Sequence, residues 1–201
     1  MVVARSEIRK NYQRTLRSLY IARHGRLDAM VNTMGGYAVG VKLWELDTKT
    51  FDQMLELNLR SGYALSRAAV RVMLKQGSGA IVNVAAKAAL DHGAGAAAYA
   101  AFKAAAVAMI DSLAEDRKGT GIRLNTVLPS ITDTEANRKA MSKADFANWP
   151  TCRCMETARG LITGGSCVHS TSQAPYHVTA NHRRRRGSLA PRVRLLQHDG
   201  F

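Results

Sequence analysis

The sequence has few cysteines and no long uninterrupted apolar run. Its three cysteines all lie beyond residue 150 and make an odd number, which excludes a disulfide framework and favours a reducing compartment such as the cytoplasm. The longest apolar stretches are rich in alanine and interrupted by Tyr99, Lys103 and Asp111, so no membrane span is expected. With 201 residues and 46% hydrophobic content, the chain is predicted to bury one globular core.

Acidic residues are scarce only at the two ends. Residues 1–26 contain seven Lys or Arg and one acidic residue, residues 27–150 contain fourteen and twelve, and residues 151–201 contain eight and two. The net charge of +14 therefore belongs mainly to the ends, and attraction to a polyanion applies to those ends alone. The balanced centre argues against nucleic acid as its partner.

The chain is expected to have three parts. Residues 1–21 carry apolar residues at helical spacing among arginines, which predicts a basic amphipathic helix that closes at His24-Gly25 and packs before the first strand. The alternative is a leader similar to a mitochondrial presequence. Residues 22–150 carry the regular pattern of a folded domain, and residues 151–201 form a basic tail.

The central part alternates strands and long helices. Residues 27–32, 80–84 and 122–128 are predicted as strands, the last one stopped by Pro129. Between them lie a helix from Asp47 or Thr50 to about residue 75 and another that runs to Asp116. Helices of this length serve as right-handed crossovers, so the sheet is expected to be parallel with its ligand at the carboxyl ends of the strands.

Tyr99 and Lys103 are the candidate catalytic pair. Four residues apart on a helix, they share one face, where the ammonium is expected to lower the phenol pKa and allow proton transfer near neutral pH. The alternative is an alanine-rich core helix with an incidental tyrosine and lysine. Asn58 interrupts the preceding helix, which suggests that its side chain interacts outside that helix. The alternative is that the asparagine is simply exposed to solvent.

Five segments in this order resemble the short-chain dehydrogenase/reductase family, over roughly residues 22–150. They are NTMG at 32–35, LELNLRSG around Asn58, GAIVNV at 79–84, YAAFK at 99–103 and RLNTVLPSITDT at 123–134. The resemblance implies an α/β, Rossmann-like doubly wound parallel sheet and hydride transfer with NAD or NADP.

The resemblance also implies roles for matching residues. Tyr99 is the expected proton donor, Lys103 lowers its pKa and binds the nicotinamide ribose, and Asn58 holds the water of a proton relay. Asn32 and Gly35 are expected to support the strand and loop near the adenine-side ribose. Pro129 and Thr134 are expected beside the nicotinamide, with Thr134 on its carboxamide.

Ala86 is a departure from the family pattern, because it stands where the catalytic serine is expected. Without that hydroxyl, ordinary ketone reduction loses a transition-state hydrogen bond. The AKAALD segment at this position resembles dihydropteridine-reductase-like members, whose quinonoid substrate is an imine. In those members a segment over the substrate follows the last shared strand, which here places Asn137, Met141 and Trp149, together with Ala86, on the substrate side; an ordinary surface helix and loop is the alternative.

The two ends also depart from the family. No GxxxGxG phosphate turn precedes Asn32, so the N-terminal βαβ units are expected to be missing, the sheet to have an open edge, and NAD(P) binding to be weak or lost. The family's final helix and strand are likewise expected to be absent. Residues 151–201 show little periodicity and are expected to be disordered, with a composition like that of an out-of-frame translation.

No metal site is predicted, because the Cys-x-Cys pair and scattered histidines of the tail lack zinc spacing. Partners are expected to be a small-molecule substrate and a second copy of the chain, held through the helix with Asn58 and the alanine-rich helix with Tyr99. The competing interpretation is a non-catalytic, degenerate reductase core whose basic tails bind nucleic acid or another polyanion.

Overall fold

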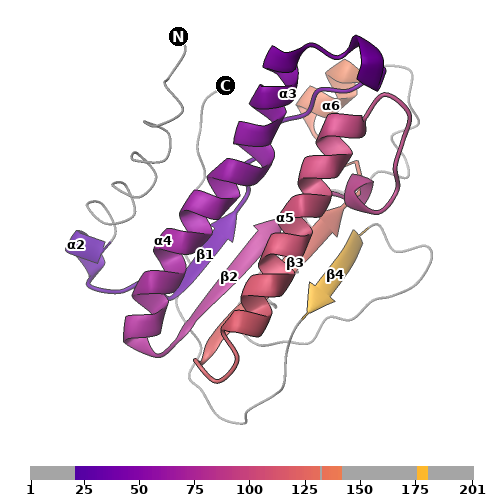
Figure 1. The fold of residues 1–201 in the computed structure, drawn as a ribbon. Helices are drawn as coiled ribbons and strands as arrows, with labels where there is room; N and C mark the ends of the chain where they lie inside the picture. The colour runs from indigo at the N-terminus through magenta and orange to yellow at the C-terminus, as the bar shows by residue number, and fades with distance from the viewer. Residues whose placement is uncertain (1–20, 132, 142–175, 181–201) are drawn as a thin grey trace.

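The computed structural model describes residues 21–131, 133–141 and 176–180 (Figure 1). Three parallel strands, β1 (Ala29–Asn32), β2 (Gly79–Val84) and β3 (Ile122–Pro129), lie side by side, and β4 (Tyr176–Ala180) pairs antiparallel to β3. The predicted Rossmann-like parallel sheet is confirmed over the three strands expected from sequence. β4 lies in the stretch that was expected to be disordered; Trp149 and the rest of residues 151–201 lie outside the described residues.

The helices are placed as follows in the described part of the chain: α2 (Ala22–His24), η2 (Leu43–Glu45), α3 (Thr48–Leu55), η3 (Glu56–Arg60), α4 (Ser61–Gln76), η4 (Lys87–Ala89), α5 (Ala97–Asp116) and α6 (Glu135–Ala140). The left-handed Gly25 ends α2 where the sequence predicted. Asp47 caps α3 by accepting hydrogen bonds from the backbone N–H and the hydroxyl of Thr50, at 2.8 and 2.7 Å.

The predicted long helix before β2 contains a π turn. It begins as α3, passes through η3 as a π turn with i to i−5 hydrogen bonding from Ser61 N–H to the Glu56 carbonyl, and continues as α4. Such turns insert one extra residue into the helix and concentrate at functional sites. Asn58 lies inside this turn, which explains why it interrupts the helical pattern.

Helices α4 and α5 lie side by side across one face of the sheet (Figure 1). The core beneath them is built from Met73 of α4, Ile110 of α5, and Ile81 and Leu124 of the sheet, all almost fully buried. By length and hydropathy α5 is also the one helix of the described residues that meets the criteria for a membrane span. One helix of this kind is weak evidence for a membrane, and part of α5 packs on β3 and the core.

A row of polar side chains crosses the sheet on the face that α4 covers. Asn32, Asn83 and Thr126 occupy the same level of β1, β2 and β3, and the Asn32 Nδ2 donates to Asn83 Oδ1 at 2.8 Å. Gly62 brings α4 close to this row, since a Cβ there would stand 2.9 Å from Asn32 Nδ2. The Asn32–Asn83 bond links β1 to β2 just before these strands deliver their loops to the site, while Asn83 Nδ2 and Thr126 Oγ1 have no hydrogen-bond partner among the described residues.

Candidate active site

The candidate site lies where β1, β2 and β3 end. The loop after β1 carries Gly35, the π turn carries Asn58, and the first two turns of α5 carry Tyr99 and Lys103. An ideal Cβ built on Gly35 would stand 2.8 Å from Lys103 Nζ and 3.1 Å from Asn58 Oδ1. The fold therefore brings these predicted residues together from separate elements.

Lys103 is a buried ammonium without a counter-ion among the described residues. Its side chain is 6% exposed, and its Nζ lies over the Tyr99 ring, 5.8 Å from the ring centroid. Burial lowers the pKa of Lys103 to about 8. An unpaired buried charge is costly, so this ammonium is suited to a ligand that offers hydroxyl or other acceptor oxygens.

The pKa of Tyr99 is raised in this structure, whereas the sequence predicted that Lys103 would bring it below its ordinary value. Burial of the half-buried phenol, followed by its electrostatic interaction with Tyr37, raises the pKa of Tyr99 to about 12. The physical reason is placement: the ammonium stands over the ring, and desolvation of the phenolate outweighs its attraction. Tyr99 consequently keeps its proton at neutral pH.

Asn58 is not a solvated side chain. It is 3% exposed, its Oδ1 accepts from Gly36 N–H at 3.2 Å, and its Nδ2 donates to the carbonyls of Gly36 at 3.0 Å and Met54 at 3.1 Å. Both ends of the amide are thus used to hold the loop after β1. The alternative of a merely exposed asparagine is excluded.

The remaining cofactor-side candidates follow β1 and β3. Asn32 is engaged inside the protein, donating to Asn83 and accepting from Met34 N–H at 3.2 Å. Pro129 is the last residue of β3 and half-buried. Thr134 caps α6, its hydroxyl accepting from Asn137 N–H at 3.2 Å.

The substrate-side candidates are less closely assembled. Ala86 is buried after β2, directly before η4, and supplies no hydroxyl. Asn137 lies in α6, and Met141 forms its C-cap. Trp149 lies outside the described residues. Within the described part of the chain, no cluster of three His, Cys, Asp or Glu side chains is arranged to hold a metal ion.

The chain matches a known protein family over most of its length. The family model described as short chain dehydrogenase matches residues 4–145. The chain belongs to the short chain dehydrogenase family. The match begins inside residues 1–21, the stretch that the sequence analysis set apart as a helix or leader.

The curated relatives of this chain include oxidoreductases. An uncharacterized oxidoreductase of Thermotoga maritima is 39% identical over 111 residues, which are 55% of this chain and 44% of the relative. D-threitol dehydrogenase of Mycolicibacterium smegmatis is 36% identical over 119 residues, 59% of this chain and 45% of the relative. The chain thus spans less than half the length of these curated relatives.

Solved structures support the fold. The crystal structure of gox2181 matches with a TM-score of 0.71 at 25% identity and covers 77% of this chain and 65% of that one. ElxO with NADP bound matches with a TM-score of 0.70 at 23% identity, over 77% of this chain and 66% of ElxO. Both matches confirm the Rossmann-like arrangement.

One residue of the site was missed by the sequence analysis. The ring of Tyr37 meets the ring of Tyr99 edge to face, with centroids 5.0 Å apart and planes at 89°. Tyr37 lies in the loop after β1, two residues beyond Gly35, and no spacing rule links it to a residue sixty-two positions later. Only the packing of that loop against α5 reveals the contact.

Proposed function

We propose that this short chain dehydrogenase is an NAD(P)-dependent oxidoreductase in which Tyr99 is the proton donor. The observation that carries the proposal is the buried Lys103 ammonium, which has no counter-ion in the described part of the chain and lies beside Tyr99 and Gly35. A nicotinamide cofactor, NAD or NADP, supplies the hydride when bound. Lys103 would hold its ribose hydroxyls, which provide the acceptors that a buried ammonium requires.

The phenol of Tyr99 is suited to donate a proton. Its pKa is raised to about 12, so it is a weaker acid than a free phenol but is protonated at neutral pH, and it can give this proton to one substrate atom while the hydride goes to another. Lys103, with a pKa of about 8, remains mostly charged at neutral pH and favours the phenolate left behind. Asn58 keeps the Gly36 backbone in place at the edge of the site.

Ala86 supports a substrate that does not depend on a serine hydroxyl. A buried methyl group cannot donate a hydrogen bond to a carbonyl oxygen, and such a bond contributes about 3 kcal/mol to comparable transition states. The conjugated C=N system of a quinonoid dihydropteridine takes up one hydride and one proton, which the cofactor and Tyr99 would provide respectively. We therefore propose that the substrate is an imine of this class and that the enzyme acts in the cytoplasm.

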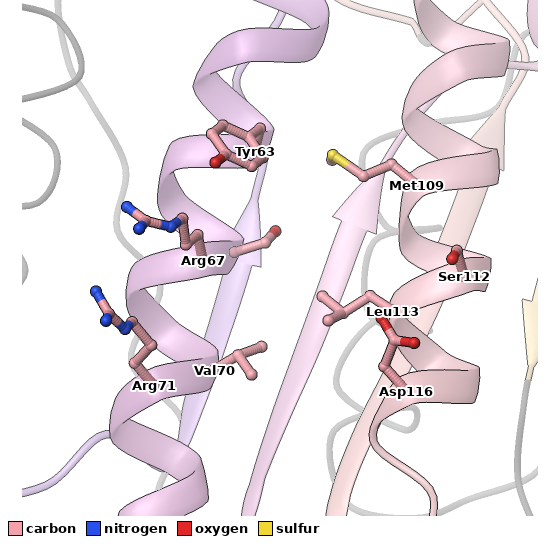
Figure 2. A pocket seen from close by; sticks show the side chains of 9 residues that line it. Tyr63, Arg67, Val70, Arg71, Met109, Ser112, Leu113 and Asp116 are labelled. Carbon is pink, nitrogen blue, oxygen red and sulfur yellow. The ribbon is translucent and has the colours of Figure 1, made fainter.

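We also propose that two copies associate through α4 and α5. A groove of about 580 Å³ runs between these helices, and Figure 2 shows Val70, Met109 and Leu113 directed into it. Arg67 of α4 and Asp116 of α5 border the same groove, so a two-fold-related copy would find apolar surface and both signs of charge. Met109→Glu is expected to reduce the oligomer to a monomer in light scattering, while Leu90→Glu, at an exposed leucine elsewhere, leaves it unchanged.

The test of the function is binding and turnover. The full chain should change the fluorescence of NADH or NADPH on binding and oxidise the nucleotide when quinonoid dihydropteridine is supplied. Tyr99→Phe should retain nucleotide binding and lose turnover by about a hundredfold or more, since it removes only the proton donor. Tyr63→Phe, at an exposed tyrosine of α4, is the matched control.

Absence of nucleotide binding by the folded chain at millimolar concentration would refute the proposed function. The competing hypothesis, a polyanion-binding protein, concerns the basic ends outside the described residues. It requires nucleic-acid binding that weakens steeply with salt and disappears when residues 151–201 are removed.

A further inference from the structure

The loop after β1 presses an aromatic ring against Tyr99. Tyr37 is 60% exposed, yet its ring meets Tyr99 at 5.0 Å between centroids in a near-perpendicular arrangement. Edge-to-face contacts of this geometry are attractive and directional. The ring therefore restricts how the Tyr99 phenol can turn and covers one side of it from solvent.

The backbone on both sides of Tyr37 is anchored. Immediately before it, Gly36 exchanges two hydrogen bonds with the buried Asn58 amide. Three residues after it, Gly40 N–H donates to the Gly95 carbonyl at 2.9 Å, and the two glycine backbones approach so closely that a Cβ on Gly95 would stand 3.1 Å from Gly40 Cα. The position of Tyr37 is thus set by the π turn on one side and by the loop before α5 on the other.

We propose that Tyr37 is a positioning residue for Tyr99: its ring fixes the phenol in the site and excludes water from one side, and Asn58 acts through Gly36 to hold Tyr37 there. This inference rests on the proposed role of Tyr99 in catalysis. It assigns Asn58 a mechanical task, the support of an aromatic contact, in addition to any contact with solvent or cofactor.

Two ionisable groups are placed against Tyr99 by the structure. Tyr37 approaches from the loop after β1, and Lys103 stands over the ring from the next turn of α5. Burial, followed by the electrostatic interaction with Tyr37, raises the pKa of Tyr99 to about 12. Removal of the Tyr37 ring exposes the phenol, while removal of its hydroxyl alone leaves the cover in place.

The first test follows the Tyr99 phenol directly and needs no turnover. Tyrosine labelled with carbon-13 at the ring carbon that bears the oxygen is titrated by NMR in the full chain, and the Tyr99 signal is assigned by its loss in Tyr99→Phe. Tyr37→Leu is expected to lower the Tyr99 titration midpoint by about one pH unit, and Tyr37→Phe to shift it by much less. Asn58→Ala is expected to move it in the same direction as Tyr37→Leu.

The control is Trp44→Leu, which removes the 79% exposed aromatic residue of η2 without touching Tyr99. A Tyr37→Leu midpoint equal to that of Trp44→Leu would overturn the proposal. So would a shift in Tyr37→Phe as large as that in Tyr37→Leu, because the hydroxyl and not the ring would then be responsible. Tyr37→Phe also preserves the bulk of the site, so the proposal can be judged even where Tyr37→Leu does not fold.

The second test uses kinetics. Tyr37→Leu is expected to lower kcat about tenfold with little change in the KM for nucleotide, and to shift the pH profile in step with the phenol titration. A fall in kcat together with a similar-fold rise in the KM for nucleotide, with the pH profile unchanged, would contradict a positioning role. If the unmutated chain shows no turnover, the proposed function fails, while the NMR titration still decides whether Tyr37 positions Tyr99.

Discussion

The buried Lys103 ammonium makes a measurable prediction about stability. Its pKa falls from 10.5 to about 8 on folding because burial disfavours the charged form. Each tenfold loss of proton affinity corresponds to about 1.4 kcal/mol, so the ammonium costs the folded chain about 3 kcal/mol wherever it is charged in both states. Lys103→Met replaces it with an unbranched apolar side chain of similar length and removes that cost.

The lowered pKa of Lys103 determines how the free energy of unfolding changes with pH. Below pH 8 the lysine is protonated whether folded or not, and the cost is fully present. Between pH 8 and 10.5 the folded state has released the proton while the unfolded state retains it, so the free energy of unfolding rises with pH. The raised pKa of Tyr99 acts oppositely, but only above its ordinary value of 10.0, where the unfolded state begins to lose the phenolic proton.

The assay is urea unfolding followed by circular dichroism at constant ionic strength, in steps from neutral pH to about pH 10. Lys103→Met should be more stable than the unmodified chain by up to about 3 kcal/mol near neutral pH, and the difference should shrink by about 2 to 3 kcal/mol on approaching the upper end of this range. Lys75→Met, at an exposed lysine of α4, controls for the loss of one charge. If the difference in free energy of unfolding between Lys103→Met and the unmodified chain stays constant across this pH range, the ammonium is not desolvated and the reasoning is refuted.

Three further predictions concern backbone, cap and chemistry. Gly119→Ala, at φ +85° with open space around it, should cost about 1 to 2 kcal/mol in urea unfolding. Gly121→Ala, at φ +75°, should cost clearly more, since its Cβ would stand 2.4 Å from the Gly77 carbonyl oxygen; equal costs would contradict this contact. Asp47→Ala should lose about 1 kcal/mol with the cap of α3, and an unchanged midpoint would show that the cap is dispensable. Ala86→Ser should raise kcat/KM for simple ketones about tenfold or more, whereas no gain would mean that position 86 does not face the reacting atom.

Much of the central fold follows from local sequence patterns. The apolar runs ending at Asn32, Val84 and Pro129 predicted all three parallel strands, and Asp47 and Gly77 bound the long helix between the first two. Periodicity, caps and turn glycines act over a few residues, which is why they can be read without the rest of the structure. β4 was missed although residues 176–180 alternate apolar and polar side chains, because the pattern spans only five residues of a stretch with little other periodicity and the strand depends on pairing with β3.

The sequence by itself determined the chemistry that is available: a Tyr99 and Lys103 pair on one helix, an Asn58 that breaks the helical pattern, and no hydroxyl at Ala86. Only the tertiary structure decided how these groups behave. Burial sets the opposite pKa shifts of Tyr99 and Lys103, and loop packing brings Tyr37 to a ring sixty-two residues away. Desolvation and long-range contacts depend on which groups the whole fold places around a residue, and the spacing of residues along the chain does not show this.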